Sequence, residues 1–420
     1  MHPRLVKEAD TLSEEGYSVR VCAGQYMDGA MEADETILRR ANWRVSFLCL
    51  KSDERPYLFL KSRIRHRLCR QLIELFWPIN LTKTFEKLIC CAYEVVFPEL
   101  LGLALEEPAD LYIAHDLRAL PVAVIAARLC QAKVGFDAED FYSGKERLEK
   151  RPNFTRALKE YVEQRYLGQC DYVTAGSPAI AEAYAAKYGV PKPVFILNVF
   201  PLSQRPSEFR HGNTNTPLTL YWFSRTIGAR RGLEDIVRAM GLLKGHQIDL
   251  HLRGAWYNGY RKELLRLATT VGLDSQRIII HPPGPPEEMV RLANPYDVGL
   301  AIEPGAGENN QIALSNKLFT YLLAGNAVIA TNTKGQQAVT KSLRCAAYCY
   351  EPGDVNMLAR HLKFLLENRR LLEESRRQAW DWGTRQYNWD LEKRKFLRVV
   401  KEVLVGDQVA HDTERVFVSG

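Results

Sequence analysis

The feature that most constrains this chain is a regular alternation of strand-like and helix-like segments. Runs rich in β-branched and aromatic residues are followed by stretches with apolar residues three or four positions apart. This pattern is typical of a parallel sheet wound with helices, because a helix has to return the chain to the start of the next strand. In such sheets, ligands bind beyond the carboxyl ends of the strands.

The alternation occurs on both sides of residues 201–217, a polar segment with three prolines that predicts a linker. We expect an N-terminal Rossmann-like domain over 1–205, a C-terminal one over 206–385, and a last helix with a tail over 386–420. The expected strands are 17–23, 43–50, 111–115, 133–137, 172–175 and 194–199, then 218–224, 248–253, 277–281, 298–303, 327–331 and 346–350.

The chain opens with a helix where a strand is expected. Over residues 3–16, Leu5, Ala9 and Leu12 share one helix face, and Gly16 ends the helix. A doubly wound domain normally opens with a strand. We therefore expect either that the N-terminal sheet lacks its first strand or that the sequence begins downstream of the true start.

Composition limits the partners and the compartment. The 57 basic and 50 acidic residues give a net charge of +7, which permits an anionic partner and does not demand nucleic acid; we expect none. The nine cysteines lack a CxxC pair, which favours reduced thiols in a cytoplasmic protein. No apolar run approaches the ~20 residues of a membrane span, and we see no signal peptide.

The segment WFSRTIGARRGLE, residues 222–234, carries three arginines between an expected strand and an expected helix. Arg225 and Arg231 can converge on one phosphate group, since arginine makes bidentate hydrogen bonds to phosphate oxygens. A helix beginning near Gly232 adds partial positive charge. The alternative is a solvated basic loop.

A second polar loop follows the expected strand that ends near Glu303. It contains Gly305 and Gly307, and a helix with Lys317 in its first turn is expected to begin near Ser315. Such a turn can hold an anion, although the GxxxxGK[ST] pattern of a P-loop is absent. A long solvated loop is the alternative.

In the N-terminal half, His115 and the acidic group Asp137, Glu139 and Asp140 also end expected strands. A histidine there can orient a substrate or move a proton, and the carboxylates would face the same edge. The alternatives are a structural histidine and a capping or solvated acidic turn.

Residues 61–70 hold five cations and no acid, and an apolar stretch ending at Trp77 follows. Such a segment can lie on an anionic membrane surface, so residues 61–77 are a candidate peripheral contact. The alternative is a basic helix face that covers the core. The sequence lacks DxD, GxSxG, HExxH and GxGxxG, so neither metal dependence nor serine hydrolase chemistry is indicated, and no metal or cofactor is expected.

Taken in order, these segments resemble the retaining GT-B glycosyltransferases and are similar to glycosyltransferase family 4. The resemblance covers nearly the whole chain and rests above all on FSRTIGARRGLEDIVRAM, IALSNKLFTYLLAGNAVIAT and the C-terminal QYNWDLEKRKFLRVVKEVL. It implies two doubly wound domains facing a cleft. It also implies transfer of a sugar from a nucleotide diphosphate-sugar to an acceptor hydroxyl, in cell-surface polysaccharide or glycolipid synthesis at or near the cytoplasmic face of the membrane.

The resemblance assigns Arg225 and Arg231 to the donor diphosphate and His115 to the transferred sugar. We expect Asp137, Glu139 and Asp140 on the acceptor side. The wider set of expected donor contacts comprises Ser224, Arg225, Arg231, Gly232, Glu308, Asn309, Asn310, Leu314, Ser315, Asn316, Lys317 and Thr320.

One departure from the family bears on the donor. Two glutamates common in the family correspond here to Ile312 and Thr320. A threonine hydroxyl can hydrogen-bond but cannot act as a charged bidentate acceptor. This leaves open a non-catalytic relative that binds a partner in a glycan-assembly complex. A sugar-nucleotide epimerase or a phosphorylase would need a carboxylate set or a cofactor lysine that the sequence does not display.

Overall fold

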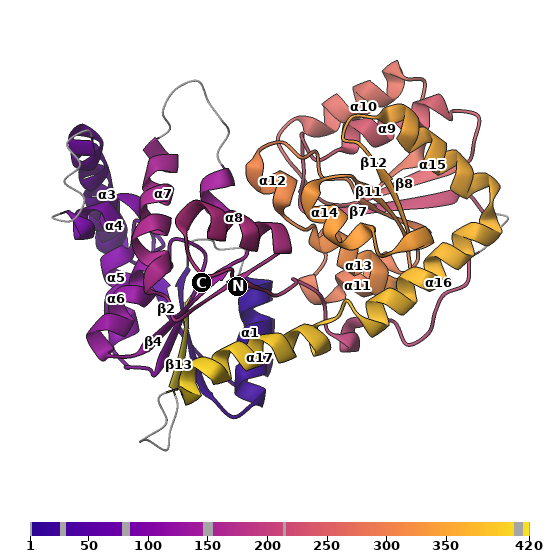
Figure 1. The fold of residues 1–420 in the computed structure, drawn as a ribbon. Coiled ribbons are helices and arrows are strands. Elements are labelled where there is room, and N and C mark those ends of the chain that lie inside the picture. The colour runs from indigo at the N-terminus through magenta and orange to yellow at the C-terminus, as the bar shows by residue number, and fades with distance from the viewer. Residues whose placement is uncertain are drawn as a thin grey trace. The chain divides into compact units, whose positions relative to one another are not determined.

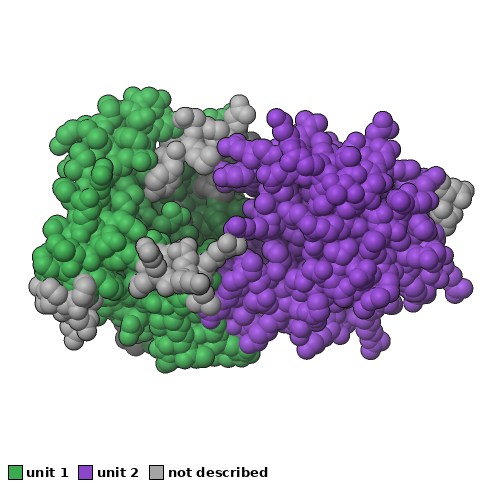
Figure 2. All heavy atoms as spheres, turned by 90° about the horizontal axis from the view of Figure 1, so that it is seen from above, with its two compact units in different colours: residues 1–176, 180–196, 393–420 green, residues 177–179, 197–392 purple. Residues whose placement is uncertain are grey.

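The computed structural model describes residues 2–25, 31–77, 85–145, 154–212, 216–406 and 415–419. The chain forms two compact units, shown in different colours in Figure 2. Unit 1 comprises residues 1–176, 180–196 and 393–420, and unit 2 comprises 177–179 and 197–392. The structure therefore moves the expected boundaries from 205/206 to 196/197 and from 385/386 to 392/393.

Contacts of the linker explain the earlier boundary. Arg376 Nη2 donates to the carbonyl of Arg210 at 2.7 Å, and Leu202 N donates to Asp390 Oδ2 at 2.8 Å. Arg205 also donates to Thr384 Oγ1 at 2.7 Å. The polar segment expected to separate the domains is thus bound along unit 2.

Unit 1 is built on a parallel sheet in the order β2-β1-β13-β3-β4-β5-β6. Its strands are β1 (Ser18–Gln25), β2 (Arg44–Cys49), β3 (Leu111–His115), β4 (Lys133–Ala138), β5 (Tyr172–Ala175), β6 (Val194–Phe195) and β13 (Arg415–Ser419). Strand β3 is buried along its whole length. The predicted strands 111–115 and 172–175 match, whereas the expected run 194–199 shortens to two residues.

The expectation of a missing first strand needs correction. The chain does open with a helix, α1 (Pro3–Glu14), but β13 occupies an interior position of the sheet, between β1 and β3. It pairs in parallel with β1 from Ser18↔Arg415 and with β3 from Val416↔Leu111. Without it, the facing edges of β1 and β3 would carry unpaired backbone groups inside the sheet, which is costly.

The remaining helices of unit 1 surround this sheet (Figure 1). They are α2 (Met31–Arg40), α3 (Pro56–Phe76), α4 (Glu86–Tyr93), α5 (Phe97–Leu105), α6 (Leu120–Cys130), α7 (Phe154–Tyr166) and α8 (Pro178–Tyr188, which begins in unit 2). The helix α17 (Trp389–Val405) also begins in unit 2 and continues into unit 1. Among the described helices, none alone is long and apolar enough to cross a membrane; α4 and α5 together meet that length and composition but are bent by 106°.

Unit 2 carries a parallel sheet in the order β12-β11-β10-β7-β8-β9. Its strands are β7 (Leu218–Ile227), β8 (Ile248–Trp256), β9 (Ile278–His281), β10 (Val298–Ala301), β11 (Ala327–Thr331) and β12 (Ala347–Tyr350). Its helices are α9 (Leu233–Leu242), α10 (Tyr260–Thr270), α11 (Met289–Ala293), α12 (Glu308–Ile312), α13 (Asn316–Ala324), α14 (Lys334–Thr340), α15 (Val355–Glu367) and α16 (Arg369–Arg385). Short 3₁₀ turns lie at Tyr142–Lys145 and Leu167–Gln169 in unit 1, and at Leu202–Gln204, Ser275–Arg277, Pro286–Glu288 and Arg344–Ala346 in unit 2.

Strands β7 and β8 run three residues beyond the ends that the sequence predicts. Their register shifts between Phe223 and Thr226, and the pairing then resumes to Ile227↔Trp256. Gly254 makes the shift possible, since a Cβ there would lie 2.2 Å from the carbonyl oxygen of Ser224. The arginine segment therefore begins inside a strand instead of in a loop.

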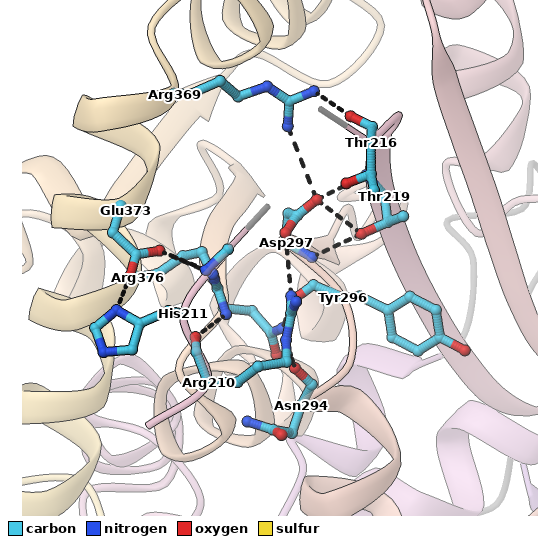
Figure 3. A network of polar contacts seen from close by, with 12 residues as sticks. Arg210, His211, Thr216, Thr219, Asn294, Tyr296, Asp297, Arg369, Glu373 and Arg376 are labelled. Atoms are coloured by element: carbon cyan, nitrogen blue, oxygen red, sulfur yellow. Dashed lines mark hydrogen bonds and ion pairs between the residues drawn. The ribbon is translucent and has the colours of Figure 1, made fainter. Parts of the chain in front are cut away.

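A polar network anchors the amino end of the unit 2 sheet (Figure 3). Asp297, directly before β10, accepts hydrogen bonds from Thr219 N and Oγ1 at 3.1 and 2.9 Å and from Arg210 at 3.1 Å. His211 and Glu373 contact each other at 2.8 Å. Because ligands of parallel sheets bind at the opposite end, we assign this network to anchoring the linker.

Candidate functional site

The arginine segment of unit 2 crosses from the end of β7 to the start of α9. Arg225 lies in β7 and is exposed, Arg230 has a left-handed backbone (φ 63°) and is exposed, and Arg231 is half-buried. Gly232 has φ 79°, and a Cβ there would lie 2.2 Å from the carbonyl oxygen of Ile302. Only glycine fits so close to the backbone that follows β10, so the start of α9 lies beside the end of β10.

A second group of charges lies at the end of β10. Glu303 Oε1 accepts from Lys317 Nζ at 2.7 Å and from Ser315 Oγ at 3.0 Å. Burial alone raises the pKa of Glu303, but Lys317, Ser315 and the nearby charge of Arg231 together hold that pKa below its usual value. The structure thus pairs Lys317 with Glu303, a carboxylate that we had not singled out, and places the charge of Arg231 near it.

The segment between β10 and α13 contains the short helix α12 and is held by contacts within itself and with α14. Gly305 and Gly307 have φ of 66° and 90°, and Asn310 Nδ2 donates to the carbonyl of Ala306 at 2.7 Å. Ser315 is the N-cap residue of α13, but its side chain makes no cap hydrogen bond, and its hydroxyl donates to Glu303 instead. The backbone N–H groups of the first turn of α13 therefore receive no cap from that hydroxyl.

The other expected donor residues occupy different environments. Asn309 is buried, Ser224 and Leu314 are partly buried, and Glu308, Asn310 and Asn316 are exposed. These positions are untested as donor contacts and stay predictions.

Ile312 and Thr320, which stand where the family often has glutamates, are both buried. Thr320 is fully buried, and its hydroxyl donates to the carbonyl of Asn316 at 3.2 Å within its own helix. Ile312 is 8% exposed, and its carbonyl accepts from Ser177 Oγ at 2.7 Å. A donor contact through the Thr320 hydroxyl would have to compete with that hydrogen bond.

At the carboxyl end of the unit 1 sheet, His115 lies in a buried ion network and is only 3% exposed. Its Nε2 lies 3.3 Å from Glu8 Oε2, and its Nδ1 lies 3.3 Å from Asp137 Oδ2. Arg4 donates through Nε and Nη2 to the two oxygens of Asp137, at 2.6 and 2.7 Å. Thr174 Oγ1 donates to Asp137 Oδ1 at 2.8 Å.

The charges of this network compensate one another. Burial alone lowers the pKa of His115, but Glu8 and Asp137 outweigh burial and raise that pKa to about 9. Burial likewise raises the pKa of Asp137, but Arg4 and His115 hold it well below its usual range. His115 is therefore positively charged at neutral pH, between two carboxylates.

Ligand atoms of Glu8, His115 and Asp137 lie within 4.8 Å of one another, as in a metal site. Arg4 already contacts both oxygens of Asp137 and lies 3.4 Å from Glu8, which supplies the positive charge that a metal ion would bring. The arrangement fits an internal ion network better than a metal centre. Since both ring nitrogens of His115 face carboxylates, its contact with a transferred sugar stays a prediction.

The acidic residues expected on the acceptor side do not form one cluster. Asp137 belongs to the ion network, whereas Glu139 pairs with His2 at 2.9 Å and Asp140 with Lys145 at 2.6 Å. Our sequence reasoning missed Arg4 and Glu8. Two opposite charges four residues apart, beside Leu5 and Ala9, were the available indication of a buried ion pair.

No family model matches the sequence, and no curated protein sequence matches it. Solved structures do match. HepE from Anabaena in complex with UDP-glucose has a TM-score of 0.64 at 15% identity, covering 95% of each chain. Sucrose-phosphate synthase from Thermosynechococcus elongatus has a TM-score of 0.63 at 14% identity, covering 93% of this chain and 100% of that one.

A glycosyltransferase from Rickettsia africae is similar to the same degree, with a TM-score of 0.62, 14% identity, and coverage of 93% of this chain and 99% of that one. At these identities the likeness concerns the fold. It confirms the predicted α/β class with two Rossmann-like domains, the architecture of the GT-B glycosyltransferases.

Proposed function

We propose that this chain is a glycosyltransferase that moves a sugar from a nucleotide diphosphate-sugar to an acceptor hydroxyl. The observation that carries the proposal is the cation cluster at the carboxyl end of the unit 2 sheet. There Lys317 pairs with Glu303 at 2.7 Å next to the start of α13, and Arg231 lies near enough for its charge to help lower the pKa of Glu303. The HepE structure is a complex with UDP-glucose, which supports the same donor class for a chain of the same fold.

The proposed mechanism is electrostatic. When the bond between the sugar and the diphosphate breaks, negative charge develops on the departing phosphate oxygens. Arg225, Arg231 and the N–H groups at the start of α13 would stabilise that charge, and fixed donors of this kind are often the largest single contribution to catalysis. Because these cations can neutralise the diphosphate, we propose transfer without a divalent ion.

The finer assignments rest on the sequence resemblance. We propose a retaining reaction in which the leaving phosphate takes the acceptor proton, with His115 orienting the sugar. We propose a polysaccharide or glycolipid acceptor and a cytoplasmic location. The membrane contact expected for residues 61–77 rests on a separate observation, the large apolar side chains that α3 exposes.

The test is a binding panel of UDP, GDP, ADP and their sugars, measured by calorimetry and thermal shift with and without EDTA. Saturable binding of one nucleotide diphosphate that survives EDTA is expected. A folded protein that binds none of them would contradict the donor assignment. Binding that disappears with EDTA and returns with Mg²⁺ would contradict the metal-independent mechanism alone.

A second candidate function is a non-catalytic binding protein of the same fold. It is favoured by Thr320 and Ile312, which place no carboxylate where the family often has two, and by the burial of His115. The discriminating measurement is turnover of the nucleotide sugar that binds. Binding without hydrolysis or transfer, across a panel of glycan and lipid-linked acceptors, would favour the non-catalytic function.

A further inference from the structure

Helix α3 of unit 1 presents two different faces. Its buried positions, Ser62, Cys69 and Ile73, lie on one narrow face, and the helix packs beside α4 (Figure 1). Arg65 reinforces this side, because it forms an ion pair with Glu99 at 2.6 Å and donates to the carbonyl of Val95 at 2.8 Å. The attachment of α3 to unit 1 therefore uses a small, mixed surface.

The opposite face of α3 is apolar and exposed. Six large apolar side chains follow the spacing of three or four residues that aligns positions on one helix face, with exposed fractions from 45% to 77%. They are Tyr57, Leu60, Ile64, Leu68, Leu72 and Leu75. At 3.6 residues per turn they span an arc of about 120°, which is the width of a stripe that normally faces a core.

An exposed stripe of this length is unusual in the water-facing surface of a protein. Single exposed leucines are common, whereas contiguous apolar patches mark binding sites. Here the apolar face turns away from the protein while a face with Ser62 and Cys69 turns toward it. The outward face of α3, defined by these six residues, is thus without an apolar partner in the described part of the chain.

Cations accompany the outward face. Lys61 falls within the stripe, and Arg63 and Arg67 lie along one of its margins. All three are exposed and have no acidic partner among the described residues. Glu74 is the one acid within Pro56–Phe76. The combination of an apolar stripe with exposed cations matches helices that lie in the plane of a membrane interface.

We propose that the outward face of α3 docks on the surface of an anionic lipid bilayer. The apolar side chains would enter the boundary between headgroups and acyl chains, while Lys61, Arg63 and Arg67 contact lipid phosphates. This proposal does not depend on the enzymatic activity. It assigns a physical partner to a surface that the donor site does not use.

The charges favour lipid over a second copy of the chain. In a two-fold symmetric contact, each outward face would meet the same face of its partner. That interface would hold Lys61, Arg63 and Arg67 from each copy, six cations, with only the two copies of Glu74 from the same helices to compensate them. An anionic bilayer offers the complementary charge instead.

The test is flotation of the full-length protein with two kinds of vesicle, pure phosphatidylcholine and phosphatidylcholine containing phosphatidylglycerol. We expect binding to the anionic vesicles that weakens as salt increases. The triple variant Leu60→Ser, Leu68→Ser, Leu75→Ser should lose binding to both kinds. The triple variant Lys61→Gln, Arg63→Gln, Arg67→Gln should bind anionic vesicles roughly 100-fold more weakly, since each cation near such a surface contributes about a factor of five.

Matched controls use exposed residues elsewhere. Leu129→Ser with Leu242→Ser removes two apolar side chains that are 63% and 59% exposed. Lys262→Gln, Arg266→Gln and Lys341→Gln remove three exposed cations of unit 2. Both controls should float as the unmodified protein does, and all variants should keep its melting temperature.

Three results would overturn the proposal. The first is equal partition of the unmodified protein to neutral and anionic vesicles, or no binding to either. The second is flotation of the leucine variant at the unmodified level. The third is self-association by analytical ultracentrifugation that the leucine variant abolishes, without flotation, because that result would assign the outward face to a second copy of the chain.

Discussion

The two units share a parallel architecture but treat the carboxyl ends of their strands differently. In unit 1, His115 and Arg4 are buried and fully compensated by Glu8 and Asp137. In unit 2, Arg225 is exposed and Arg231 is half-buried, and the nearby acid Glu303 is paired with Lys317. The carboxyl ends of the strands therefore carry a buried ion network in one unit and solvent-exposed positive charge in the other.

The sheets also differ in how the chain builds them. The six strands of unit 2 come from the continuous segment 218–350, whereas the position between β1 and β3 in unit 1 is filled by β13 from residues 415–419. Unit 1 thus depends on a contact between distant parts of the chain. The following predictions test these contrasts, beginning with the largest expected effect.

Ending the chain at residue 406 should unfold unit 1 and leave unit 2 folded. The truncation removes β13 and exposes the backbone edges of β1 and β3 to water. Hydrogen exchange should show loss of protection in β1 and β3 but not in β10 and β11. A synthetic peptide of residues 411–420 should restore protection, and unchanged exchange in the truncated chain would contradict the strand order.

Arg4→Ala should destabilise the protein by about 3–5 kcal/mol, because it leaves Asp137 buried without its main cation. Urea denaturation measures the change. Arg118→Ala is the matched control, since Arg118 is 59% exposed and pairs with the surface carboxylate of Asp116. Its expected cost is within about 0.5 kcal/mol, and an equal cost for both variants would refute the contrast between buried and exposed arginines.

Arg231→Ala should lower sugar transfer by about 10²–10³-fold while changing stability little, because the side chain is half-buried and is proposed to act on the departing diphosphate. Steady-state kinetics measure the rate of sugar transfer, and thermal melts measure the stability. Arg266→Ala, which removes an exposed arginine of α10, should change neither. Full turnover by the Arg231 variant would remove Arg231 from the mechanism.

The contribution of His115 to the stability of unit 1 should fall as the pH rises through about 9. The pKa of His115 increases from 6.5 to about 9 on folding, so its contribution is complete below 6.5 and disappears as the pH passes 9. The shift corresponds to about 3 kcal/mol. Burial lowers the pKa of Lys7 to about 7, which acts with opposite sign in the same window.

The difference between the pH profiles of the unmodified protein and His115→Gln isolates the histidine, because Lys7 is common to both proteins. This difference should be largest near pH 6 and should shrink by pH 10. A difference that stays constant over this range would mean that the charge of His115 does not contribute.

Glu303→Gln should have the smallest effect. Removing the carboxylate charge beside Arg231 and Lys317 should strengthen nucleotide diphosphate binding by about fivefold at low salt, with less effect at high salt. Calorimetric titration at two ionic strengths is the measurement. Weaker binding by the variant would show that Glu303 contacts the ligand instead of competing for its cations.

Local pattern was sufficient for much of the fold. The strands 111–115, 172–175 and 327–331 were predicted from composition and periodicity, because buried parallel strands read as short β-branched runs between helices. The arginine segment and the polar loop after β10 were also recognisable, since strand ends in such sheets are marked by changes in residue type. The sequence did not show that both segments approach Glu303.

What the sequence by itself determined is therefore the class of the fold and the two segments that carry cations, because both depend on residues close together in the chain. The tertiary structure alone decided three further features. It placed β13 between β1 and β3, it joined Arg4 to Asp137 across 133 residues, and it turned the apolar face of α3 outward. These features depend on which distant groups satisfy each other's hydrogen bonds and charges, and spacing along the chain does not encode that choice.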